Sequence, residues 1–306
     1  MKIISDINHP TIPPSATTIG FFDGVHCGHR FLINQVREAA AKGGLCTALV
    51  TFSAHPRQVI QTAYHPQLLS SPTEKLELLE TTAADYCILL PFTSELSQLS
   101  AREFMQLLRD TFNIRMLVIG YDHRFGHNRS ESFEDYCRYG KELDIYIVRA
   151  RVYTDKGNKI SSSAIRQLLE RGEVDRAAQY LGYNYHLDGT VVEGHKIGRK
   201  IGFPTANLQV DCQDKLIPAG GVYAVYVYVE GKKQAGMLNI GTRPTLDNGK
   251  ELSIEVNIFH FAQDIYHKNI RIEFVKYLRN EKKYNTIDEL IAQMHKDREE
   301  AASILL

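Results

Sequence analysis

Two histidines and several glycines stand close together in residues 18–30, where an apolar segment gives way to a predicted helix. His26 and His29 are three positions apart, and Gly28 lies between them. A strand that turns sharply into a helix leaves unpaired backbone N–H groups at the positive end of the helix dipole, and such a turn binds anions. We therefore expect this turn to hold the phosphate chain of a nucleotide. Its other predicted binding residues are Gly20, Phe22, Asp23 and Gly24.

The same stretch has two other interpretations. Many sharp strand-to-helix turns are rich in glycine without binding a ligand, because glycine readily adopts positive φ. The spacing of His26 and His29 is also short enough for a pair of metal ligands. A cation would then lie at the positive end of a helix dipole, so we favour the phosphate interpretation.

Three further polar clusters follow predicted strands in the first half. Each has an ordinary interpretation, because charged loop residues are usually solvated and a run of serines before a helix is usually an N-cap. Hydroxyl groups, helix N–H groups and an arginine one turn into the helix can also form a second anion site. Such a site would grip the outer phosphates while the histidine turn holds the inner one. The clusters are His55 and Arg57; Asp122, Phe125 and Gly126; and Ser161, Ser162, Ser163 and Arg166.

The elements that must position these clusters alternate between strand and helix patterns. Residues 45–52 form a continuous apolar segment, which is typical of a strand in a buried parallel sheet. Residues 31–42 are amphipathic and end at two glycines, as helices do. The alternation predicts an α/β domain with a doubly wound parallel sheet, in which ligands bind beyond the carboxyl ends of the strands. The expected strands are 16–20, 45–52, 86–90, 116–120 and 144–148, and the expected helices include 31–42, 72–80, 100–110, 132–139 and 174–181.

A glycine-rich segment, residues 189–208, carries the chemistry of the second half. Its glycines and two lysines suit a mobile flap that closes over phosphates, although the spacing is not that of a Walker loop. Thr205 and Asn207 follow Pro204 and can present oxygens on one side of an extended segment, and hard oxygens suit Mg²⁺. A glycine-rich loop alone is more often structural. The expected flap residues are Gly189, Gly194, Lys196, Gly198, Lys200 and Gly202.

Strand alternation replaces the α/β pattern after Gly182. Residues 222–229 alternate between two faces, and turn sequences such as 230–233 predict hairpins. The pattern favours a small antiparallel barrel or sandwich. A last helix is expected to start at Thr286, and its apolar stripe is expected to pack on the core. The stripe consists of Ile287, Leu290, Ile291 and Met294. We therefore predict two domains, residues 1–182 and 183–306.

Several of these motifs resemble known enzymes. Residues 20–29 resemble the His-x-Gly-His signature of the adenylyltransferase superfamily, in the longer form found in bacterial FAD synthetases. Residues 160–166 are similar to the Ile-Ser-Ser-Thr-x-Ile-Arg motif of the same family, with Ser163 in place of threonine and the hydroxyl retained. Residues 120–126 resemble its flavin- and nucleotide-side loop.

The second half resembles riboflavin kinases. Residues 202–208, Gly-Phe-Pro-Thr-Ala-Asn-Leu, are similar to the riboflavin kinase signature, and residues 237–245 and 254–256 look like further parts of it. The resemblance covers nearly the whole chain, in the order of the bacterial bifunctional riboflavin kinase/FAD synthetases.

This resemblance implies two reactions of ATP. The second domain would transfer the γ-phosphoryl group to riboflavin, giving FMN, and the first would then adenylylate FMN, giving FAD and pyrophosphate. In the kinase site it implies Glu255 as the general base, with Mg²⁺ held by Thr205 and Asn207. In the other site it implies that His26 and His29 stabilise charge at the α-phosphate. Further implied binding residues are Pro204, Asn239, and the set Ser161, Ser162, Ser163 and Arg166 for pyrophosphate, with Tyr277 and Arg279 as weaker flavin contacts.

Two rival functions remain at this point. An adenylyltransferase for another phosphate would explain the first half but not residues 189–255. A flavin-binding module without turnover would not need His26, His29, Arg166 and Glu255 together. Cys27 adds a separate hypothesis, a thiol that bound ATP protects from alkylation, against the alternative of a small side chain packed inward.

The composition limits the partners. Lys plus Arg and Asp plus Glu both number 36 in 306 residues, so a broad electrostatic surface for nucleic acid is not expected. The first residues lack the apolar core of a signal peptide, and no apolar run reaches spanning length, so we expect no membrane partner. Five scattered cysteines suit the reducing cytoplasm. The expected ligands are riboflavin, FMN and ATP.

Overall fold

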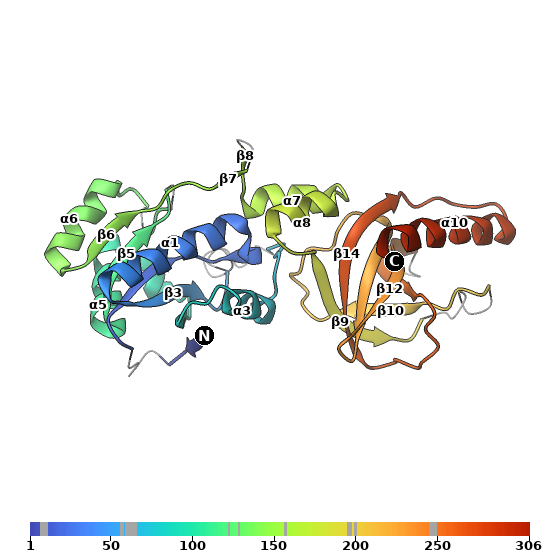
Figure 1. The fold of residues 1–306 in the computed structure, drawn as a ribbon, viewed down its shortest axis with the longest axis horizontal. Coiled ribbons are helices and arrows are strands. Elements are labelled where there is room, and N and C mark those ends of the chain that lie inside the picture. Colours follow the sequence, from blue (N-terminus) through green and yellow to red (C-terminus); the bar gives the residue numbers. More distant parts are fainter. Residues whose placement is uncertain are drawn as a thin grey trace. The chain divides into compact units, whose positions relative to one another are not determined.

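The computed structural model describes residues 1–6, 12–55, 58, 66–121, 123–127, 129–155, 158–194, 198, 201–244 and 250–306. Contacts divide the chain into two units, Met1–Ser162 and Ser163–Leu306. Figure 1 colours the first unit from blue to green and the second from yellow-green to red. The predicted junction at Gly182 lies inside the second unit, because α7 (Ser162–Glu170) and α8 (Val174–Leu181) are bonded to the segments that follow. Leu169 O accepts from Ala219 N at 3.0 Å, and Asp175 pairs with Lys276 at 2.7 Å.

The first unit is built on a six-stranded parallel sheet of order β1-β4-β3-β2-β5-β6, as the α/β pattern predicts. The strand β2 (Ser15–Ile19) is fully buried between β3 (Cys46–Phe52) and β5 (Ile114–Ile119). The chain leaves β2 toward β3 on one side and later returns to β5 on the other. The strand order therefore reverses at β2, and ligands of such sheets bind beyond the carboxyl ends at that point. The remaining strands are β1 (Lys2–Ile4), which the sequence pattern missed, β4 (Tyr86–Leu90) and β6 (Tyr146–Arg149).

Capping residues set the helix boundaries. Helices α3 (Pro72–Glu80) and α5 (Ala101–Phe112) follow Ser71 and Ser100, which both form capping boxes. Helix α1 (Cys27–Gly43) ends at Gly44, whose φ of 63° suits a glycine C-cap. The other elements of this unit are η1 (Asp23–Val25), α4 (Ser94–Gln98), α6 (Phe133–Leu143), β7 (Thr154–Asp155) and β8 (Asn158–Lys159).

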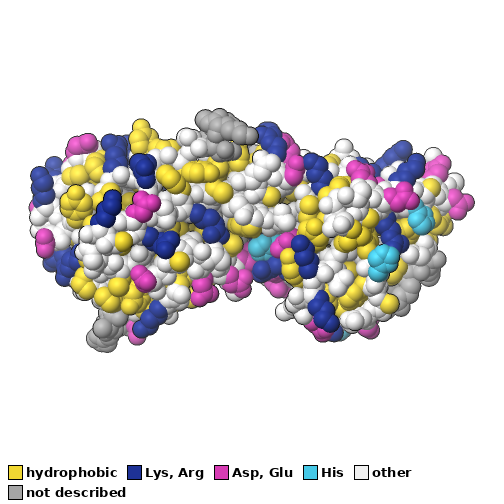
Figure 2. All heavy atoms as spheres, in the orientation of Figure 1, with side chains coloured by type: hydrophobic (Ala, Val, Ile, Leu, Met, Phe, Trp, Pro, Cys, Tyr) yellow, Lys and Arg dark blue, Asp and Glu magenta, His cyan; other side chains and the backbone are white. Residues whose placement is uncertain are grey.

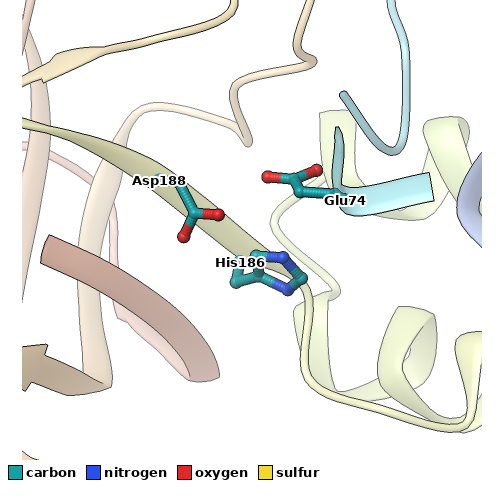
Figure 3. Close-up of side chains that lie close together, drawn as sticks. All are labelled: Glu74, His186 and Asp188. Carbon is teal, nitrogen blue, oxygen red and sulfur yellow. The ribbon is translucent and has the colours of Figure 1, made fainter. Parts of the chain in front are cut away.

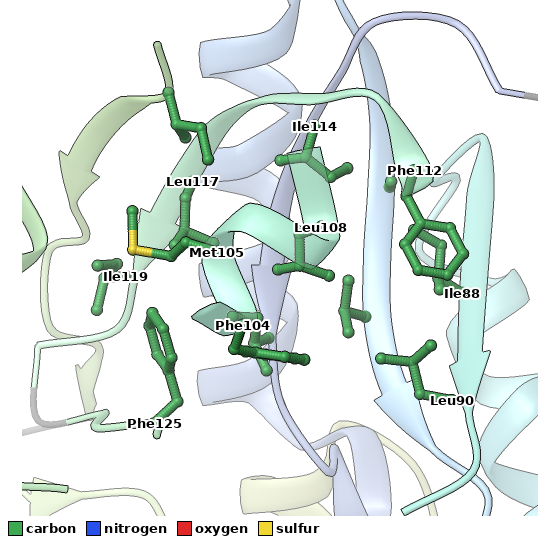
Figure 4. Close-up of a cluster of buried hydrophobic side chains, with 14 of the residues drawn as sticks. Ile88, Leu90, Phe104, Met105, Leu108, Phe112, Ile114, Leu117, Ile119 and Phe125 are labelled. Atoms are coloured by element: carbon green, nitrogen blue, oxygen red, sulfur yellow. The ribbon is translucent and has the colours of Figure 1, made fainter. Parts of the chain in front are cut away.

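Apolar side chains cover both faces of this sheet. On one face, α5 packs Phe104, Met105 and Leu108 against the strands (Figure 4). On the other face, α1 packs Val36 and Ala40 against the sheet. Burial on both faces explains why β3, β4 and β5 are largely apolar.

The second unit contains a closed antiparallel barrel of order β10-β13-β12-β11-β14-β9, which decides between the barrel and the sandwich. Strand β9 (His186–Val192) closes it by pairing with both β14 (Asn269–Arg279) and β10 (Ala206–Val210). The sequence assigned Gly189 to the flap, but it lies in β9. A Cβ at Gly189 would overlap the carbonyl oxygen of Gln209, so the glycine permits a close strand approach. The remaining strands are β11 (Gly221–Val229), β12 (Lys232–Pro244) and β13 (Lys250–Ile258).

Helix α10 (Ile287–Leu305) packs on the barrel with part of the predicted stripe. Ile291 and Met294 join a cluster with Ala224 and Met237, whereas Ile287 is 65% exposed. The expectation of core packing therefore fails for the first residue of the stripe, because the helix begins beyond the barrel's apolar surface.

Strand β9 also carries a polar cluster. His186 and Asp188 are two residues apart and project from the same side of the strand (Figure 3). Asp188 accepts two hydrogen bonds of 2.7 Å from Arg271, its neighbour on β14. Burial lowers the pKa of His186 to about 3, with the positive charges of Lys215 and Arg271 adding to the effect. This imidazole is therefore neutral at pH 7, and the ion pair ties β9 to β14.

Basic and acidic side chains are interspersed over the face drawn in Figure 2. Among the helices of the described ranges, none combines the length and the apolar character needed to cross a membrane.

Candidate active sites

The turn that follows β2 uses backbone angles that few side chains adopt. Phe22 has φ 56°, Val25 has φ 37°, and Gly24 between them has φ 74°. Such residues cluster at functional sites where the surroundings fix them. The ring of Phe22 is buried and lies 2.8 Å from where a Cβ of Gly20 would be, so Gly20 is needed for close packing.

The carboxylate of Asp23 holds this turn in place through hydrogen bonds with the protein backbone. Its Oδ1 accepts hydrogen bonds from the backbone N–H groups of Leu69, at 2.9 Å, and Ser70, at 3.1 Å. The Ser70 hydroxyl accepts from Gly24 N at 3.0 Å, and Ser162 Oγ donates to the carbonyl of Asp23 at 3.0 Å. Asp23 and Ser162, both predicted to bind the ligand, thus have structural hydrogen bonds that hold the turn in shape.

The two histidines are stacked at the first turn of α1. Their ring centroids are 3.6 Å apart and their planes differ by 16°. His26 is the N-cap, and its Nδ1 accepts from the backbone N–H of His29 at 3.3 Å. A Cβ at Gly28 would lie 3.1 Å from the His26 ring, so glycine leaves room for the stack. Because His26 Nδ1 is used as a cap, the arrangement disfavours the metal-ligand interpretation.

His29 is held as a neutral imidazole. Burial lowers its pKa well below the usual value, and the neighbouring His26 and His123 lower it further. Its Nδ1 is buried and has no hydrogen-bond partner among the described residues. A neutral imidazole carries one N–H group, so this ring can donate a hydrogen bond to a phosphate without carrying a net charge.

A cavity of about 290 Å³ opens beyond the carboxyl ends of β2 and β3. Phe125, one of its wall residues, is stacked on Tyr136 at 4.5 Å and bonded through its backbone N–H to Tyr136 Oη at 3.1 Å. Gly126 has φ 93° and lies so close to Ala101 that a Cβ would be 2.6 Å from its backbone nitrogen. The walls are largely aromatic and aliphatic, with polar groups from His123, Arg124, His127 and Arg129.

The other predicted residues of the first half have varied surroundings. His55 is half-buried, with its ring edge-on to Phe21 at 4.7 Å. Arg166 lies one turn into α7, in the second unit, as does Ser163. Cys27 is the partly exposed first residue of α1, and its reactivity stays a prediction. Arg57, Asp122, Lys196 and Lys200 lie outside the described residues.

Strand register assembles the polar row of the barrel, which consists of Asn207, Glu255 and Asn239. Glu255 on β13 is directly opposite Asn207 on β10 and directly opposite Asn239 on β12. Opposite residues of antiparallel strands place their side chains on one face. Thr205 Oγ1 donates a hydrogen bond to Glu255 Oε2 at 3.2 Å. The predicted general base and both predicted Mg²⁺ ligands are therefore neighbours, although they are up to fifty residues apart in sequence.

Two cavities meet at Thr205. One, of about 80 Å³, has apolar walls that include Val191, Val256 and Ile258. The other, of about 290 Å³, contains Glu255 together with the residues Gly198, Asn239, Asn257, Arg279, Tyr284, Leu290 and Asp297. A carboxylate and a hydroxyl at the junction of two cavities suit a transfer between two bound molecules.

Part of the predicted flap closes on this junction. The carbonyl of Gly198 accepts from Phe203 N at 2.8 Å and from Ile201 N at 3.2 Å, which forms a turn. Gly202 has φ 83°, and a Cβ at Gly194 would overlap the side-chain amide of Asn207. These glycines therefore allow the segment to approach the polar row closely.

Sequence reasoning missed several residues of the barrel cavity. Asn257 lies two positions after Glu255 and donates from Nδ2 to the carbonyl of Pro204 at 2.7 Å; strand periodicity could have found it. Asp297 is 3% exposed and binds Arg279 through two guanidinium nitrogens, Nε at 2.9 Å and Nη2 at 2.7 Å. Its signal is a carboxylate three residues after Met294 of the apolar stripe. Tyr277, expected near the flavin, donates a hydrogen bond to Asn280 at 2.6 Å and is not one of the described residues that line this cavity.

Comparisons with known proteins agree with both halves. Residues 9–164 match the family model for FAD synthetase, and residues 181–305 match that for riboflavin kinase. A bifunctional riboflavin kinase/FMN adenylyltransferase of Listeria monocytogenes is 36% identical, over 96% of this chain and 95% of the relative. This chain belongs to the family of bifunctional riboflavin kinase/FMN adenylyltransferases. Family members from Bacillus subtilis and Escherichia coli K12 are each 35% identical, covering 94% and 97% of this chain and 91% and 96% of their own.

A solved structure resembles the whole chain of this family member. It is described as a macrolide-efflux protein from Streptococcus pneumoniae, and it matches with a TM-score of 0.90 and 32% identity over 98% of each chain. That description concerns the other protein, and the likeness shows that the two chains share their fold over nearly their whole lengths.

Proposed function

We propose that this chain phosphorylates riboflavin with ATP to give FMN, and adenylylates FMN with a second ATP to give FAD and pyrophosphate. The observation that carries the kinase part is the polar row at the junction of two barrel cavities. The stacked histidines at the strand-order reversal support the adenylyltransferase part. We assign residues 1–182 to adenylylation and 183–306 to the kinase, in the cytoplasm, as the scattered free cysteines favour.

In the kinase, riboflavin would occupy the larger barrel cavity and the adenine of ATP the apolar one, with the triphosphate reaching Thr205. Glu255 would accept the proton of the riboflavin 5′-hydroxyl as its oxygen bonds to the γ-phosphorus and ADP leaves. The Thr205 hydrogen bond at 3.2 Å would aim the carboxylate. Arg279, held by Asp297, would face the flavin from the far wall.

The donor set at this junction fits a magnesium ion brought in with ATP. The Thr205 hydroxyl and the Asn207 amide are oxygen ligands of the hard kind that Mg²⁺ prefers, and Glu255 lies beside both. The ion would neutralise phosphate charge when bound. The residues of this chain would orient the triphosphate and hold the accepting base.

In the adenylyltransferase, FMN would occupy the aromatic cavity of the first unit, with Phe125 in its wall. An oxygen of the FMN phosphate would attack the α-phosphorus of ATP, and pyrophosphate would leave, so no protein nucleophile is needed. His26 and His29 would stabilise charge at the α-phosphate by hydrogen bonds. Ser161, Ser163 and Arg166 would hold the departing pyrophosphate.

Product analysis tests this proposal. We expect the purified protein with riboflavin, ATP and MgCl₂ to form FMN first and FAD later, and excess EDTA to stop both. Nicotinamide mononucleotide and phosphopantetheine, offered in place of FMN, should remain unchanged. Adenylylation of either compound, with FMN left intact, would instead support the rival adenylyltransferase function.

A further inference from the structure

The ammonium group of Lys75 is buried beside residues 20–29 of the first unit, the turn proposed to hold phosphate and called the phosphate turn below. Lys75 lies on α3 and is only 3% exposed. Lysine is rarely buried this fully unless it is paired with a carboxylate. Here the described residues provide it with no salt bridge. Its Nζ donates instead to the carbonyl oxygen of Phe52 at 2.8 Å and lies 4.2 Å from the ring centroid of Phe21.

Both partners of Lys75 belong to the proposed adenylylation site. Phe52 is the last residue of β3, and its side chain lines the aromatic cavity. Phe21 comes two residues after β2 and directly precedes the strained Phe22. The carbonyl of Phe21 accepts from Thr51 Oγ1 at 3.2 Å. One ammonium group therefore fastens the carboxyl ends of two adjacent strands, where the turn and the cavity begin.

Burying the Lys75 charge lowers the stability of the folded protein. Burial lowers the pKa of Lys75 from 10.5 to about 8, and the nearby Cys87 thiol and Asp23 carboxylate offset only part of the effect. The folded protein thus holds this proton less tightly than the unfolded chain does. The charged form opposes folding below pH 8, and that opposition fades as the pH rises from 8 toward 10.5. A stability role alone would be better served by an apolar side chain of similar length.

We propose that Lys75 is a positioning residue for FMN adenylylation, whose charged ammonium keeps Phe21 and the end of β3 in register with the phosphate turn. It touches neither nucleotide nor flavin. Its hydrogen bond to Phe52 and its contact with the face of the Phe21 ring reach their full strength only when the Lys75 amine is protonated. Small displacements at this point would shift the turn relative to the flavin cavity.

The first test is Lys75→Met. We expect kcat/KM for FAD formation to fall at least about tenfold, since misplacing reacting groups by about 1 Å can lower rates by about 100-fold. FMN formation by the same polypeptide should stay within about twofold, which also reports that the chain is folded. The melting temperature should be unchanged or higher, because a buried charge has been removed. Lys42→Met, at an exposed position of α1, is the matched control and should change none of these values.

A merely structural lysine would give the opposite result. Lys75→Met would then lower the melting temperature and leave kcat/KM for FAD formation near that of the unsubstituted chain, and this outcome overturns the proposal.

The second test needs no variant. In the unsubstituted protein, kcat/KM for FAD formation should fall as the pH rises from 7 to 9.5, with a midpoint near the Lys75 pKa of about 8. The charged or titratable groups that act on Lys75 are the Asp23 carboxylate on η1 and the Cys87 thiol on β4. The thiol does not explain such a fall, because burial raises the pKa of Cys87 to about 11, above the tested range. FMN formation, measured in parallel, should not show this midpoint.

Lys75→Arg sharpens the second test, because arginine stays charged across this range. Its profile should lack the fall near pH 8, whatever its absolute rate. A flat profile for the unsubstituted protein, or the same fall in Lys75→Arg, would overturn the proposal.

Discussion

The phosphate turn at residues 20–29 and the polar row of the barrel fix their side chains by different means. The turn depends on the positive φ angles of Phe22 and Val25, and on hydrogen bonds that the Asp23 carboxylate accepts from the backbone of residues 69–70. The polar row depends on strand register, which places Glu255 between Asn207 and Asn239 without unusual angles. In the turn, substitution of any residue that shapes the backbone should therefore lower activity. In the polar row, substitution should lower activity chiefly at the reacting groups themselves.

The largest effect should come from the reacting carboxylate. We expect Glu255→Gln to lower kcat for FMN formation about 100- to 10,000-fold, the range for loss of a general base. FAD formation from supplied FMN should stay within about twofold of the unsubstituted protein, because that reaction is assigned to other groups, His26 and His29 of the first unit. Glu230→Gln, at an exposed hairpin position, is the control. Normal FMN formation by Glu255→Gln would remove the assigned base.

His29→Ala is the counterpart in the turn. We expect kcat for FAD formation to fall about 100- to 1,000-fold, as when a hydrogen-bond donor to developing charge is removed. FMN should then accumulate from riboflavin at a nearly normal rate. The measurement is a time course of both flavins by chromatography. Loss of both products in a chain that circular dichroism shows to be folded would contradict the two-site account.

Asp297→Asn tests the far wall of the barrel cavity. Arg279 would keep its charge but lose an ionised partner that is almost fully buried, so we expect a loss of about 2 kcal/mol in the free energy of unfolding. The KM for riboflavin should rise about tenfold with a smaller change in kcat, the pattern of lost binding. Glu299→Gln, exposed on the same helix, should change neither. An unchanged KM would mean that this pair does not orient Arg279 for the flavin.

Gly28→Ala should have the smallest effect and sharpens the comparison. The added Cβ would lie 3.1 Å from the His26 ring, so the stack must shift by a few tenths of an ångström. We expect kcat/KM for FAD formation to fall about threefold to tenfold through misplacement of the rings. Gly43→Ala, at the last residue of the same helix, is the matched control, because a Cβ there would meet only ordinary contacts of 3.4 Å or more, and it should leave FAD formation unchanged. No change in Gly28→Ala would show that the turn tolerates a moved His26.

Much of this arrangement follows from the sequence. The continuous apolar segments predict a parallel sheet because both faces are covered, and α1 and α5 cover them. The capping box at Ser100 predicts the start of α5 directly. The strand alternation after Gly182 predicts antiparallel strands, but closure depends on β9, whose pairing with β10 and β14 is invisible in its own sequence.

The site was predictable where residue type carries the chemistry and unpredictable where the surroundings do. His26, His29 and Thr205 are conspicuous by type and spacing, whereas Glu255 was assigned only through the resemblance to riboflavin kinases. Lys75 and Asp297 resemble ordinary helix surface residues in the sequence, and only packing shows that both are buried. Asp23 and Gly189 are the converse cases, since each looks like a ligand-binding residue and is given a structural role by its neighbours.

The central claim is that the two reactions use different phosphorus atoms of ATP. The kinase reaction attacks the γ-phosphorus, and the adenylylation reaction attacks the α-phosphorus. Labelled ATP tests it in a single measurement on the His29→Ala and Glu255→Gln chains. With riboflavin, His29→Ala should place γ-phosphate label in FMN and no α-phosphate label in any flavin. With supplied FMN, Glu255→Gln should place α-phosphate label in FAD. Label from the α-phosphate in the flavins of His29→Ala at the rate of the unsubstituted protein, or absence of both labels from folded chains, would contradict the account.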